Sequence, residues 1–387
     1  MTNSHQEYDF VLVGGGLQAG LLALAIDHHN PTANVLILEK NKCLFGNHTW
    51  SFHRSDISCE WSWISQLSIT QWPGYTVHFP GINRIVELPY CSVSSDQFRK
   101  TIKRLSINSD RLRVQTEAEV NEVETHCVRT SKGEFLGKTI VDCRGKTTGG
   151  LSGVGYQKFL GLELILGEDW PDLLPTIMEA NLDQNDGYRF LYVLPFEPRR
   201  ILIEDTFFSE SSLIDQDQSA KAIESYLENR RVSRWQVIRR EQGCLPMPFT
   251  STCQPVTSNQ LTGGYAGGWF HAATGFSFAL AARFADVVAS SESDLIGRNV
   301  SRLAEKNRFQ RTFARFLNRL LFHLVPPSCR HEIFRRFYTK LPDDAIQRFY
   351  AHAFTKTDAV RILFGLPPSS LTPIKFFQSF KAAICRA

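Results

Sequence analysis

The order of apolar and polar residues near the N-terminus predicts a strand, a glycine turn, a helix and a second strand. Residues 8–13 (YDFVLV) form a short apolar run, as in a buried parallel strand. Gly14-Gly15-Gly16 and an alanine- and leucine-rich run follow, and residues 35–38 (VLIL) end at Glu39. Strand, glycines, helix, strand and acid in this order indicate a dinucleotide-binding βαβ unit.

Several residues of this unit have a physical reason to contact a dinucleotide. Gly14 permits a tight turn, and Gly16 lets the backbone approach a pyrophosphate. The N–H groups at the start of the helix can bind phosphates, and Glu39 can accept hydrogen bonds from ribose hydroxyls. Small residues at the start of the helix keep it close to the sheet. The predicted cofactor residues here are Val13, Gly14, Gly16, Ala19, Gly20 and Glu39.

Hydrophobic periodicity further along the chain predicts more strands and helices. The segment 45–53 is polar and aromatic, as in a loop that lines a ligand, and Ser95-Asp96 caps a predicted helix through residue 105. Short strands are predicted at 112–114, 120–123 and 127–129, and a buried parallel strand at 139–145. Long antiparallel strands are predicted at 156–166, 188–196, 200–207 and 235–241, and helices near 220–227 and 276–289.

The C-terminal part reads as all helical. Between residues 308 and 324 an apolar stripe (Phe309, Phe313, Phe316, Leu320 and Leu324) alternates with a basic one (Arg308, Arg311, Arg315 and Arg319) at helical spacing. The second glycine turn before residue 276 predicts another helix N-terminus facing the cofactor, and it adds Gly275, Phe276 and Ser277 to the cofactor residues.

Together these elements predict an α/β fold, α+β overall, with a Rossmann-type FAD-binding lobe, an antiparallel substrate lobe and a helical C-terminal region. The FAD lobe takes residues 1–55, 95–154 and 246–300. The substrate lobe takes 56–94 and 155–245, and the basic tail 301–387 forms a membrane or substrate cap. A single nucleotide fingerprint with an inserted antiparallel lobe favours FAD over a small NAD dehydrogenase, and it leaves NADPH at most a transient contact.

Charge is distributed unevenly along the 387 residues. The last 87 residues contain 16 Lys and Arg against 5 Asp and Glu, a balance of +11, whereas the rest of the chain has −7. The same tail holds 12 of the 28 phenylalanines, which favours an anionic surface, membrane or nucleic acid, as partner. Nine cysteines without a Cys-x-x-Cys pair, and an N-terminus that leads directly into a strand, favour a cytoplasmic protein with reduced thiols.

Two adjacent acids, Glu204 and Asp205, interrupt an otherwise apolar strand. Alternation places Leu202, Glu204 and Thr206 on one face and Asp205 on the other, so both carboxyls reach one pocket only if a bulge intervenes. A carboxyl facing an apolar cavity has a raised pKa and is a candidate general acid. The alternative is that the strand ends here and both acids are solvated or bind the Arg199-Arg200 pair.

Other candidates for chemistry are weaker. His271 precedes the helix at 276–289 and could contact a flavin, although a structural histidine is as good a reading. His48 and His53 lack the spacing of metal ligands, so no metal site is predicted. No Gly-x-Ser-x-Gly elbow is present, which disfavours a serine nucleophile.

Motifs along the whole chain resemble those of the bacterial lycopene β-cyclases, an FAD-dependent family of carotenoid biosynthesis. The matching stretches are GGGL (14–17), GNHTW (46–50), GYQKF (155–159), DGYRF (186–190), IEDT (203–206), GCLP (243–246), FHAATGFS (270–277), RFY (348–350), Asp358, RIL (361–363) and GLPP (365–368). Two departures stand out. Plant members have Glu-Glu where this chain has Glu204-Asp205, and the related flavin hydroxylases have Gly-Asp where this chain has Gly267-Gly268.

The resemblance implies an intramolecular lyase, or isomerase, that cyclises the open ends of lycopene to β-ionone rings, through γ-carotene to β-carotene. It implies reduced FAD that stabilises a carbocation, NADPH as transient electron donor and no net redox change. Glu204 falls on the family's acid position, Asp205 on its acidic neighbour and Glu39 on its ribose-binding acid. It also implies a peripheral protein on the inner face of the cell membrane, next to other carotenoid-pathway enzymes and without a nucleic-acid partner.

Two alternatives remain at the level of sequence. One is a flavin-dependent monooxygenase or polyene reductase acting on a lipophilic substrate, which would change the mass of the product. The other is a membrane-surface flavoprotein that only carries electrons or lipid.

Overall fold

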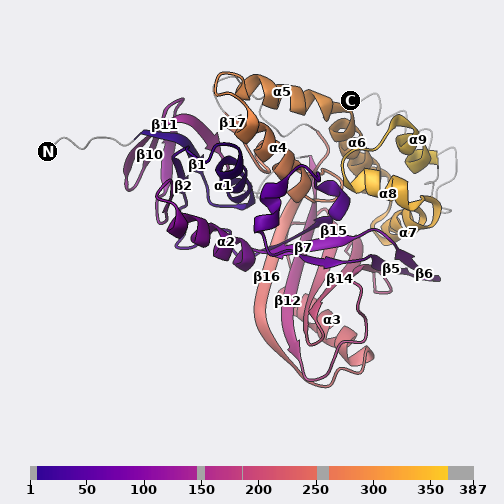
Figure 1. The fold of residues 1–387 in the computed structure, drawn as a ribbon. Helices are drawn as coiled ribbons and strands as arrows, with labels where there is room; N and C mark the ends of the chain where they lie inside the picture. Colours follow the sequence, from indigo (N-terminus) through magenta and orange to yellow (C-terminus); the bar gives the residue numbers. More distant parts are fainter. Residues whose placement is uncertain (1–6, 146–152, 185, 251–260, 365–387) are drawn as a thin grey trace.

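The computed structural model describes residues 7–145, 153–184, 186–250 and 261–364. Figure 1 shows the N-terminal lobe at one end, a long twisted sheet that projects from it, and the C-terminal helices beside both. Three sheets organise these parts.

The first sheet contains the predicted βαβ unit. Its strand order is β8-β2-β1-β11-β10-β9, and β17 also pairs with β11. The strands are β1 Glu7–Val13, β2 Val35–Leu38, β8 Leu112–Gln115, β9 Val120–Val123, β10 Cys127–Thr130, β11 Gly133–Asp142 and β17 Leu261–Thr262. β1 runs parallel to both β2 and β11, and α1 (Leu17–His29) packs with α4 (Phe278–Ser290) over this sheet. The predicted strand, turn, helix and strand are thereby confirmed.

The second sheet has the order β16-β12-β15-β14-β13-β5-β6. Its strands are β5 Tyr75–Phe79, β6 Ile82–Val86, β12 Val154–Leu166, β13 Thr176–Glu179, β14 Tyr188–Glu197, β15 Arg200–Ser209 and β16 Trp235–Pro248. The antiparallel pairing of β12, β14, β15 and β16 confirms the predicted long strands. β5 and β6, from an earlier part of the chain, extend the same sheet, with β5 parallel to β13.

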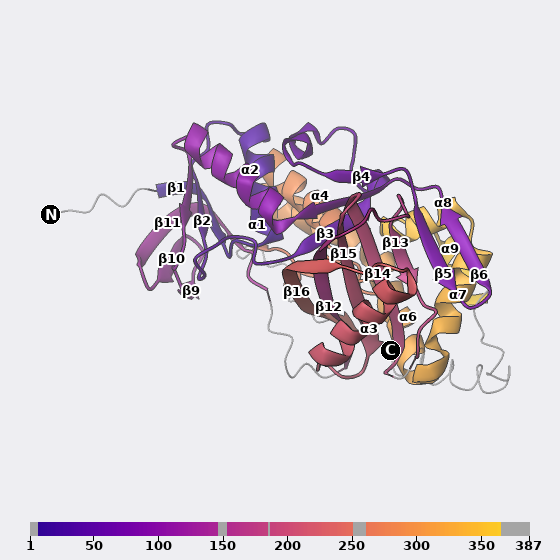
Figure 2. The same ribbon diagram turned by 90° about the horizontal axis from the view of Figure 1, so that it is seen from below.

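The two faces of the second sheet are covered by different elements, as Figure 2 shows from below. On one face, which we call the α3 face, α3 (Gln216–Asn229) packs through Ile223 and Leu227 against Leu164 and Ile203. The opposite face, the cavity face, carries Phe190 and Phe208, which pack with side chains of the C-terminal helices. Strand alternation therefore separates an ordinary core from a face that turns toward the rest of the molecule.

A third sheet, β3-β7-β4, joins the first two. It consists of β3 Thr49–His53, β4 Thr70–Trp72 and β7 Tyr90–Ser94, and β7 leads into α2 Ser95–Asn108. The expectation of a loop at 45–53 is thus wrong for 49–53, because these residues pair with β7. The cap of α2 is Ser94 rather than Ser95: its hydroxyl accepts from the N–H of Gln97, whose side chain accepts from the N–H of Ser94.

The described part of the tail is helical, as predicted. It contains α5 Ile296–Lys306, α6 Arg308–Leu324, α7 Arg330–Lys340, α8 Asp343–Tyr350 and α9 Lys356–Phe364, and short 3₁₀ turns lie at Arg54–Asp56, Ser62–Gln66 and Pro327–Cys329. The predicted apolar stripe of α6 is only partly buried: Phe309 is exposed, whereas Ala314, Asn318 and Leu321 are buried. The motif at 365–368 lies outside the described residues. Of the described helices, none is long and apolar enough to cross a membrane.

Candidate active site

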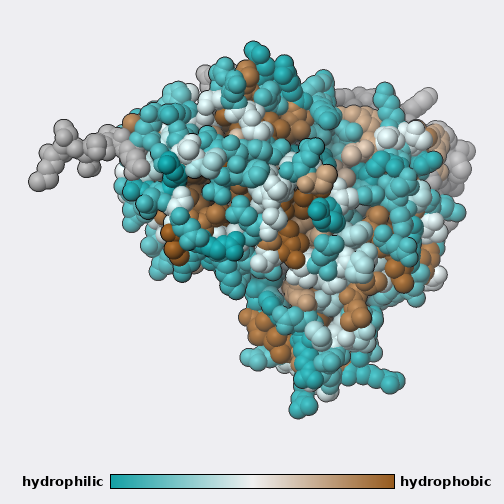
Figure 3. Space-filling view, in the orientation of Figure 1, coloured by the Kyte–Doolittle hydropathy of each residue, from teal (hydrophilic) through white to brown (hydrophobic). Residues whose placement is uncertain are grey.

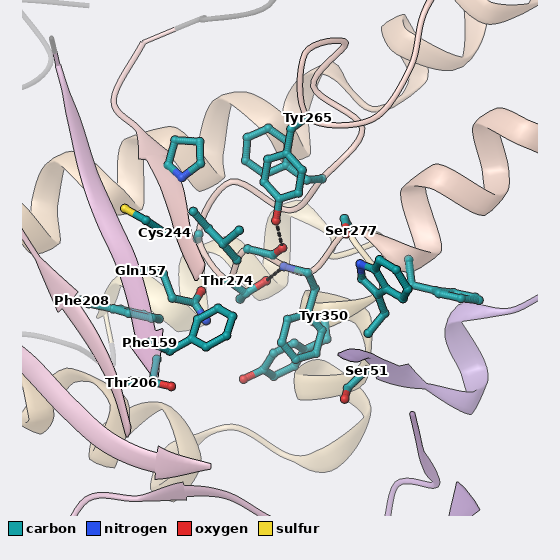
Figure 4. A pocket seen from close by; sticks show the side chains of 18 of the residues that line it. Ser51, Gln157, Phe159, Thr206, Phe208, Cys244, Tyr265, Thr274, Ser277 and Tyr350 are labelled. Atoms are coloured by element: carbon teal, nitrogen blue, oxygen red, sulfur yellow. Dashed lines mark hydrogen bonds between the residues drawn. The ribbon is translucent and has the colours of Figure 1, made fainter. Parts of the chain in front are cut away.

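A cavity of about 650 Å³ opens where the three sheets and the C-terminal helices meet. Side chains from elements far apart in the sequence point into it, as Figure 4 shows for Ser51 of β3, Gln157 and Phe159 of β12, Thr206 and Phe208 of β15, and Tyr350 of α8. The cavity is continuous from the glycine turn after β1 to the tail helices. It therefore connects the predicted cofactor turn with the helical tail.

The glycine turn after β1 forms one end of the cavity. Gly14 has φ +98°, a conformation that favours glycine, and a Cβ placed on Gly16 would meet no described atom within 4 Å. The first turn of α1 has no acidic residue and no side-chain cap among the described residues, so its N–H groups are available to an anion. Open space at Gly16 beside these donors fits the pyrophosphate of a dinucleotide.

Glu39 lies beside this turn and lines the cavity. Its carboxylate accepts hydrogen bonds from the N–H of Gly15 at 2.8 Å and from the N–H of Asn41 at 2.9 Å. These bonds fix the carboxylate at the end of β2, the position from which an acid reaches the ribose hydroxyls.

The turn before α4 contributes the second group of predicted cofactor residues. Gly275, Phe276 and Ser277 line the cavity, and Gly275 has φ +72°. The Tyr265 hydroxyl donates to the Gly275 carbonyl, as Figure 4 shows. This turn and the one after β1 face the same space from two sides.

The remaining predicted cofactor residues lie behind the cavity wall. Val13 and Ala19 are fully buried, and a Cβ on Gly20 would lie 2.6 Å from the Phe45 ring. The fourth of these residues, Gly14, forms the turn itself. They hold α1 against the sheet but do not line the cavity, so any effect on a cofactor acts through the position of the turn.

Glu204 and Asp205 lie on opposite faces of β15, as alternation predicted. β15 continues to Ser209, so the alternative in which the strand ends at these acids is wrong. Glu204 lines the cavity, whereas Asp205 is completely buried on the α3 face and binds the Arg189 guanidinium at 2.8 and 2.9 Å. No bulge brings the two together, because their pairing with β12 is regular. The two acids therefore do not enter one pocket, as expected for a strand without a bulge, and a part of Asp205 in the chemistry stays a prediction.

Glu204 has the environment of a protonated acid. Burial raises its pKa well above the ordinary value of 4.5, and the neighbouring Glu241 raises it further, while Arg239 acts in the opposite direction. Glu241 is the residue that sequence reasoning missed. Its strand was predicted, but its approach to Glu204 depends on how β15 and β16 pair across β12, which no local pattern records.

The far end of the cavity is apolar. Helices α6, α7 and α9 line it with the side chains of Leu317, Leu320, Leu321, Leu324, Ile333, Phe334, Phe337, Ile362 and Leu363. Sequence reasoning placed Leu320 and Leu324 on an apolar stripe of the tail but did not predict that the three helices line a cavity together, because their common orientation results from packing between helices. The apolar end suits a hydrocarbon ligand.

One of the candidate histidines lines the cavity, and another has a structural environment. His48 lines the cavity. His271 is buried away from it, with Nε2 in contact with the Phe349 carbonyl at 3.0 Å and Nδ1 accepting from the Ala273 N–H, and burial lowers its pKa to about 4. The structural reading of His271 is therefore the better one. Within the described ranges, no group of His, Cys, Asp and Glu side chains has the arrangement of a metal site.

Comparison with known proteins gives two kinds of match. A family model described as lycopene cyclase protein matches residues 9–375. A lycopene β-cyclase of Pantoea ananas is 35% identical over 368 residues, 93% of this chain and 95% of that protein. A lycopene β-cyclase of Pseudescherichia vulneris is 33% identical, with 94% and 95% covered.

Solved structures share the fold at low sequence identity. A geranylgeranyl bacteriochlorophyll reductase-like protein from Thermoplasma acidophilum superposes with a TM-score of 0.63 at 14% identity, over 94% of this chain and 97% of that one. A flavin-dependent brominase superposes with a TM-score of 0.60 at 16% identity, over 92% and 97%. The mixed α/β fold expected from the sequence is thereby confirmed.

Proposed function

The chain belongs to the lycopene cyclase family, and from this premise we propose that it is a lycopene β-cyclase that closes the open ends of lycopene into β-ionone rings, through γ-carotene to β-carotene. The observation that carries the proposal is Glu204, a buried acid with a raised pKa, in the wall of a cavity with a long apolar end.

Glu204 supplies the proton that starts the reaction. Its carboxyl transfers a proton to a terminal double bond, which leaves a carboxylate and a tertiary carbocation. The neighbouring double bond attacks the cation and closes the ring, and loss of a ring proton to the Glu204 carboxylate completes it. One proton is given and one returns, so the mass of the carotenoid does not change.

The rest of the cavity positions the chain and excludes water. Phe159, Phe190 and Phe208 on the cavity face contact the polyene near Glu204, and the tail helices enclose the apolar remainder. Asp205 has a structural role in this proposal, because its ion pair with Arg189 anchors the α3 face of the same strand.

The turn at Gly16, Glu39 and the loop of Gly275–Ser277 would hold FAD. The open space at Gly16 and the available N–H groups of α1 support this choice. When bound in its reduced form, FAD would supply negative charge that stabilises a carbocation, and NADPH would serve as a transient electron source. Binding is measurable without activity: Gly16→Ala, which the fold accommodates, should weaken FAD binding in a fluorescence titration, while Lys132→Ala, at an exposed turn outside the cavity, is the control.

The test of the function is the product. The purified protein is incubated with reduced FAD and lycopene in liposomes, once without oxygen and once in air, and the carotenoids are separated and their masses are measured by mass spectrometry. Products that have the mass of lycopene and the absorption spectrum of a carotenoid with β-ionone rings support cyclisation. An added oxygen or added hydrogens would instead identify a monooxygenase or a polyene reductase, and unchanged lycopene would identify a protein that only carries electrons or lipid.

We propose that the protein acts at a membrane surface, because lycopene partitions into lipid. Other carotenoid-pathway enzymes are proposed to bind at the same surface. Figure 3 shows apolar side chains in separate patches on one face of the molecule rather than in one broad band. The basic stripe of α6, Arg308, Arg311, Arg315 and Arg319, is the proposed contact with anionic lipid. Replacing Arg311, Arg315 and Arg319 by Ala should weaken binding to anionic liposomes, and replacing Lys100, Lys103 and Arg104 of α2 is the matched control. Equal binding of the two triple variants would refute this role of α6.

A further inference from the structure

Two glutamates face one another across a glycine in the second sheet. Gly161 of β12 pairs with Glu204 of β15 on one side and with Glu241 of β16 on the other. A Cβ on Gly161 would lie 3.0 Å from the Cγ of each glutamate. The missing side chain therefore leaves the space in which the two carboxyl groups meet above the central strand.

Glu241 is held through one of its two carboxyl oxygens. Arg239 donates to Oε2 of Glu241 at 2.6 Å, and the Thr49 hydroxyl donates to the same oxygen at 3.2 Å. The other oxygen, Oε1, is buried and receives no hydrogen bond from any N–H or O–H group among the described residues. A buried acceptor without a donor is costly, and a protonated Glu204 is the group placed to provide one.

We infer that Glu241 is a positioning residue that keeps the transferable proton on Glu204, through a carboxyl–carboxylate hydrogen bond across Gly161. The inference rests on the proposed cyclisation. It adds a second acid to the reaction and assigns it a position that alternation along β15 alone does not reveal.

The like charge of Glu241 acts at two stages. Before the reaction it opposes ionisation of Glu204, which adds to the effect of burial on the Glu204 pKa. When Glu204 gives its proton to the polyene, the O–H bond breaks, a C–H bond forms and two carboxylates then lie side by side. This pair of charges stabilises the carbocation and also draws the ring proton back to Glu204. Glu241 itself is not consumed.

Other charged and titratable groups face the pair from the elements around it. Arg239 of β16 lowers the Glu204 pKa and is shared with Glu163 of β12 at 2.5 Å. Burial raises the pKa of the Tyr192 hydroxyl of β14. Burial lowers the pKa of His48, and the charge of Glu241 opposes this shift. Among these groups Glu241 is the one that raises the Glu204 pKa.

The test measures the protonation of Glu204 directly and through kinetics. In Glu241→Gln the like charge is gone and the amide can donate to a Glu204 carboxylate, so Glu204 should ionise at lower pH. The upper limb of the kcat profile should move to lower pH by about one unit or more, with kcat largely recovered under acidic conditions and KM little changed. The infrared C=O band of the protonated carboxyl, assigned by its loss in Glu204→Gln, should titrate with the same shift.

Controls make the result decisive. Glu228→Gln, the same change at an exposed acid of α3, should leave the profile and the band in place. If Glu241→Gln does not fold, Gly161→Ala is measured instead: its methyl group forces the two side chains apart, so the band should again titrate at lower pH. An unmoved band and profile, or an equal loss of kcat at every pH, would overturn the inference. If the wild type forms no cyclised product, the proposed function fails, but the infrared titration still tests the pair.

Discussion

The two faces of β15 place neighbouring acids in opposite surroundings. On the cavity face, Glu204 lies beside a second acid, Glu241, whereas on the α3 face Asp205 accepts hydrogen bonds from Nε and one terminal nitrogen of the Arg189 guanidinium. Burial raises the pKa of both carboxyls; for Asp205 the Arg189 cation opposes that rise, and for Glu204 the Glu241 charge adds to it.

The difference separates an acid that can donate a proton from one that stabilises the fold. A buried carboxylate bound by a cation is costly to disturb, and it faces a packed core with no room for a substrate. A buried carboxyl next to a like charge keeps its proton and faces open space. The sequence positions differ by one residue, so the strand's alternation decides which acid takes which role.

The largest expected effect is the loss of cyclisation in Glu204→Gln. Removing the proton donor should lower kcat by a factor of about 10² to 10⁴. FAD binding and the far-UV spectrum should stay as in the wild type, because the amide occupies the same space. Product formation from lycopene and a flavin titration measure the two properties. Activity within about twofold of the wild type would remove Glu204 from the mechanism.

Mutation on the α3 face should change the stability of the protein rather than its activity. Arg189→Met leaves the Asp205 carboxylate buried without its cation, and the free energy of unfolding should fall by about 3–5 kcal/mol. Activity per folded molecule should remain close to that of the wild type. Urea unfolding followed by fluorescence measures the change, and a second substitution, Asp205→Leu, should recover much of it. A loss of kcat in molecules that are folded would place Asp205 in the chemistry after all.

Local patterns in the sequence were sufficient for many of the elements and for the separation of Glu204 from Asp205. The βαβ unit, the long strands and the tail helices follow from spacing within each segment, and so does the separation of Glu204 from Asp205. These features depend on neighbours a few residues away, which the sequence displays directly.

Features that depend on distant partners were not predictable in the same way. Glu241 approaches Glu204 only because both strands pair with Gly161, far earlier in the chain. Residues 49–53 become a strand because β7 offers them a partner, and the buried side of α6 is set by the helices and strands that pack on it. Each of these features depends on pairing or packing between distant segments, which hydrophobic periodicity within one segment does not determine.

The pH dependence of stability sharpens the comparison further. Because the pKa of Glu204 is raised in the folded state, the native protein holds a proton that the unfolded chain loses above about pH 4.5. Stability should therefore decrease as pH rises from this value through the folded pKa, by up to about 1.4 kcal/mol per pH unit for one proton. Glu204→Gln removes this contribution, so its stability relative to the wild type should increase with pH. The raised pKa of Asp205 has the same sign but is common to both proteins.

Urea unfolding of the two proteins over a series of pH values measures this difference. A constant difference between them would mean that Glu204 is ionised in the folded protein, which contradicts its assigned role as the acid.

The smallest effects are expected when one methyl group is removed from the α3 face or from the cavity face of β15. Ile203 packs in the core under α3, so Ile203→Val should lower the free energy of unfolding by about 1 kcal/mol and leave product formation unchanged. Thr206→Ser removes a methyl group that lines the cavity. Space is already present there, so the loss of stability should stay below about 0.5 kcal/mol, and the effect should appear in KM for lycopene. Equal losses of stability at the two positions would show that the cavity face is packed as tightly as the α3 face, and that the polyene needs another site.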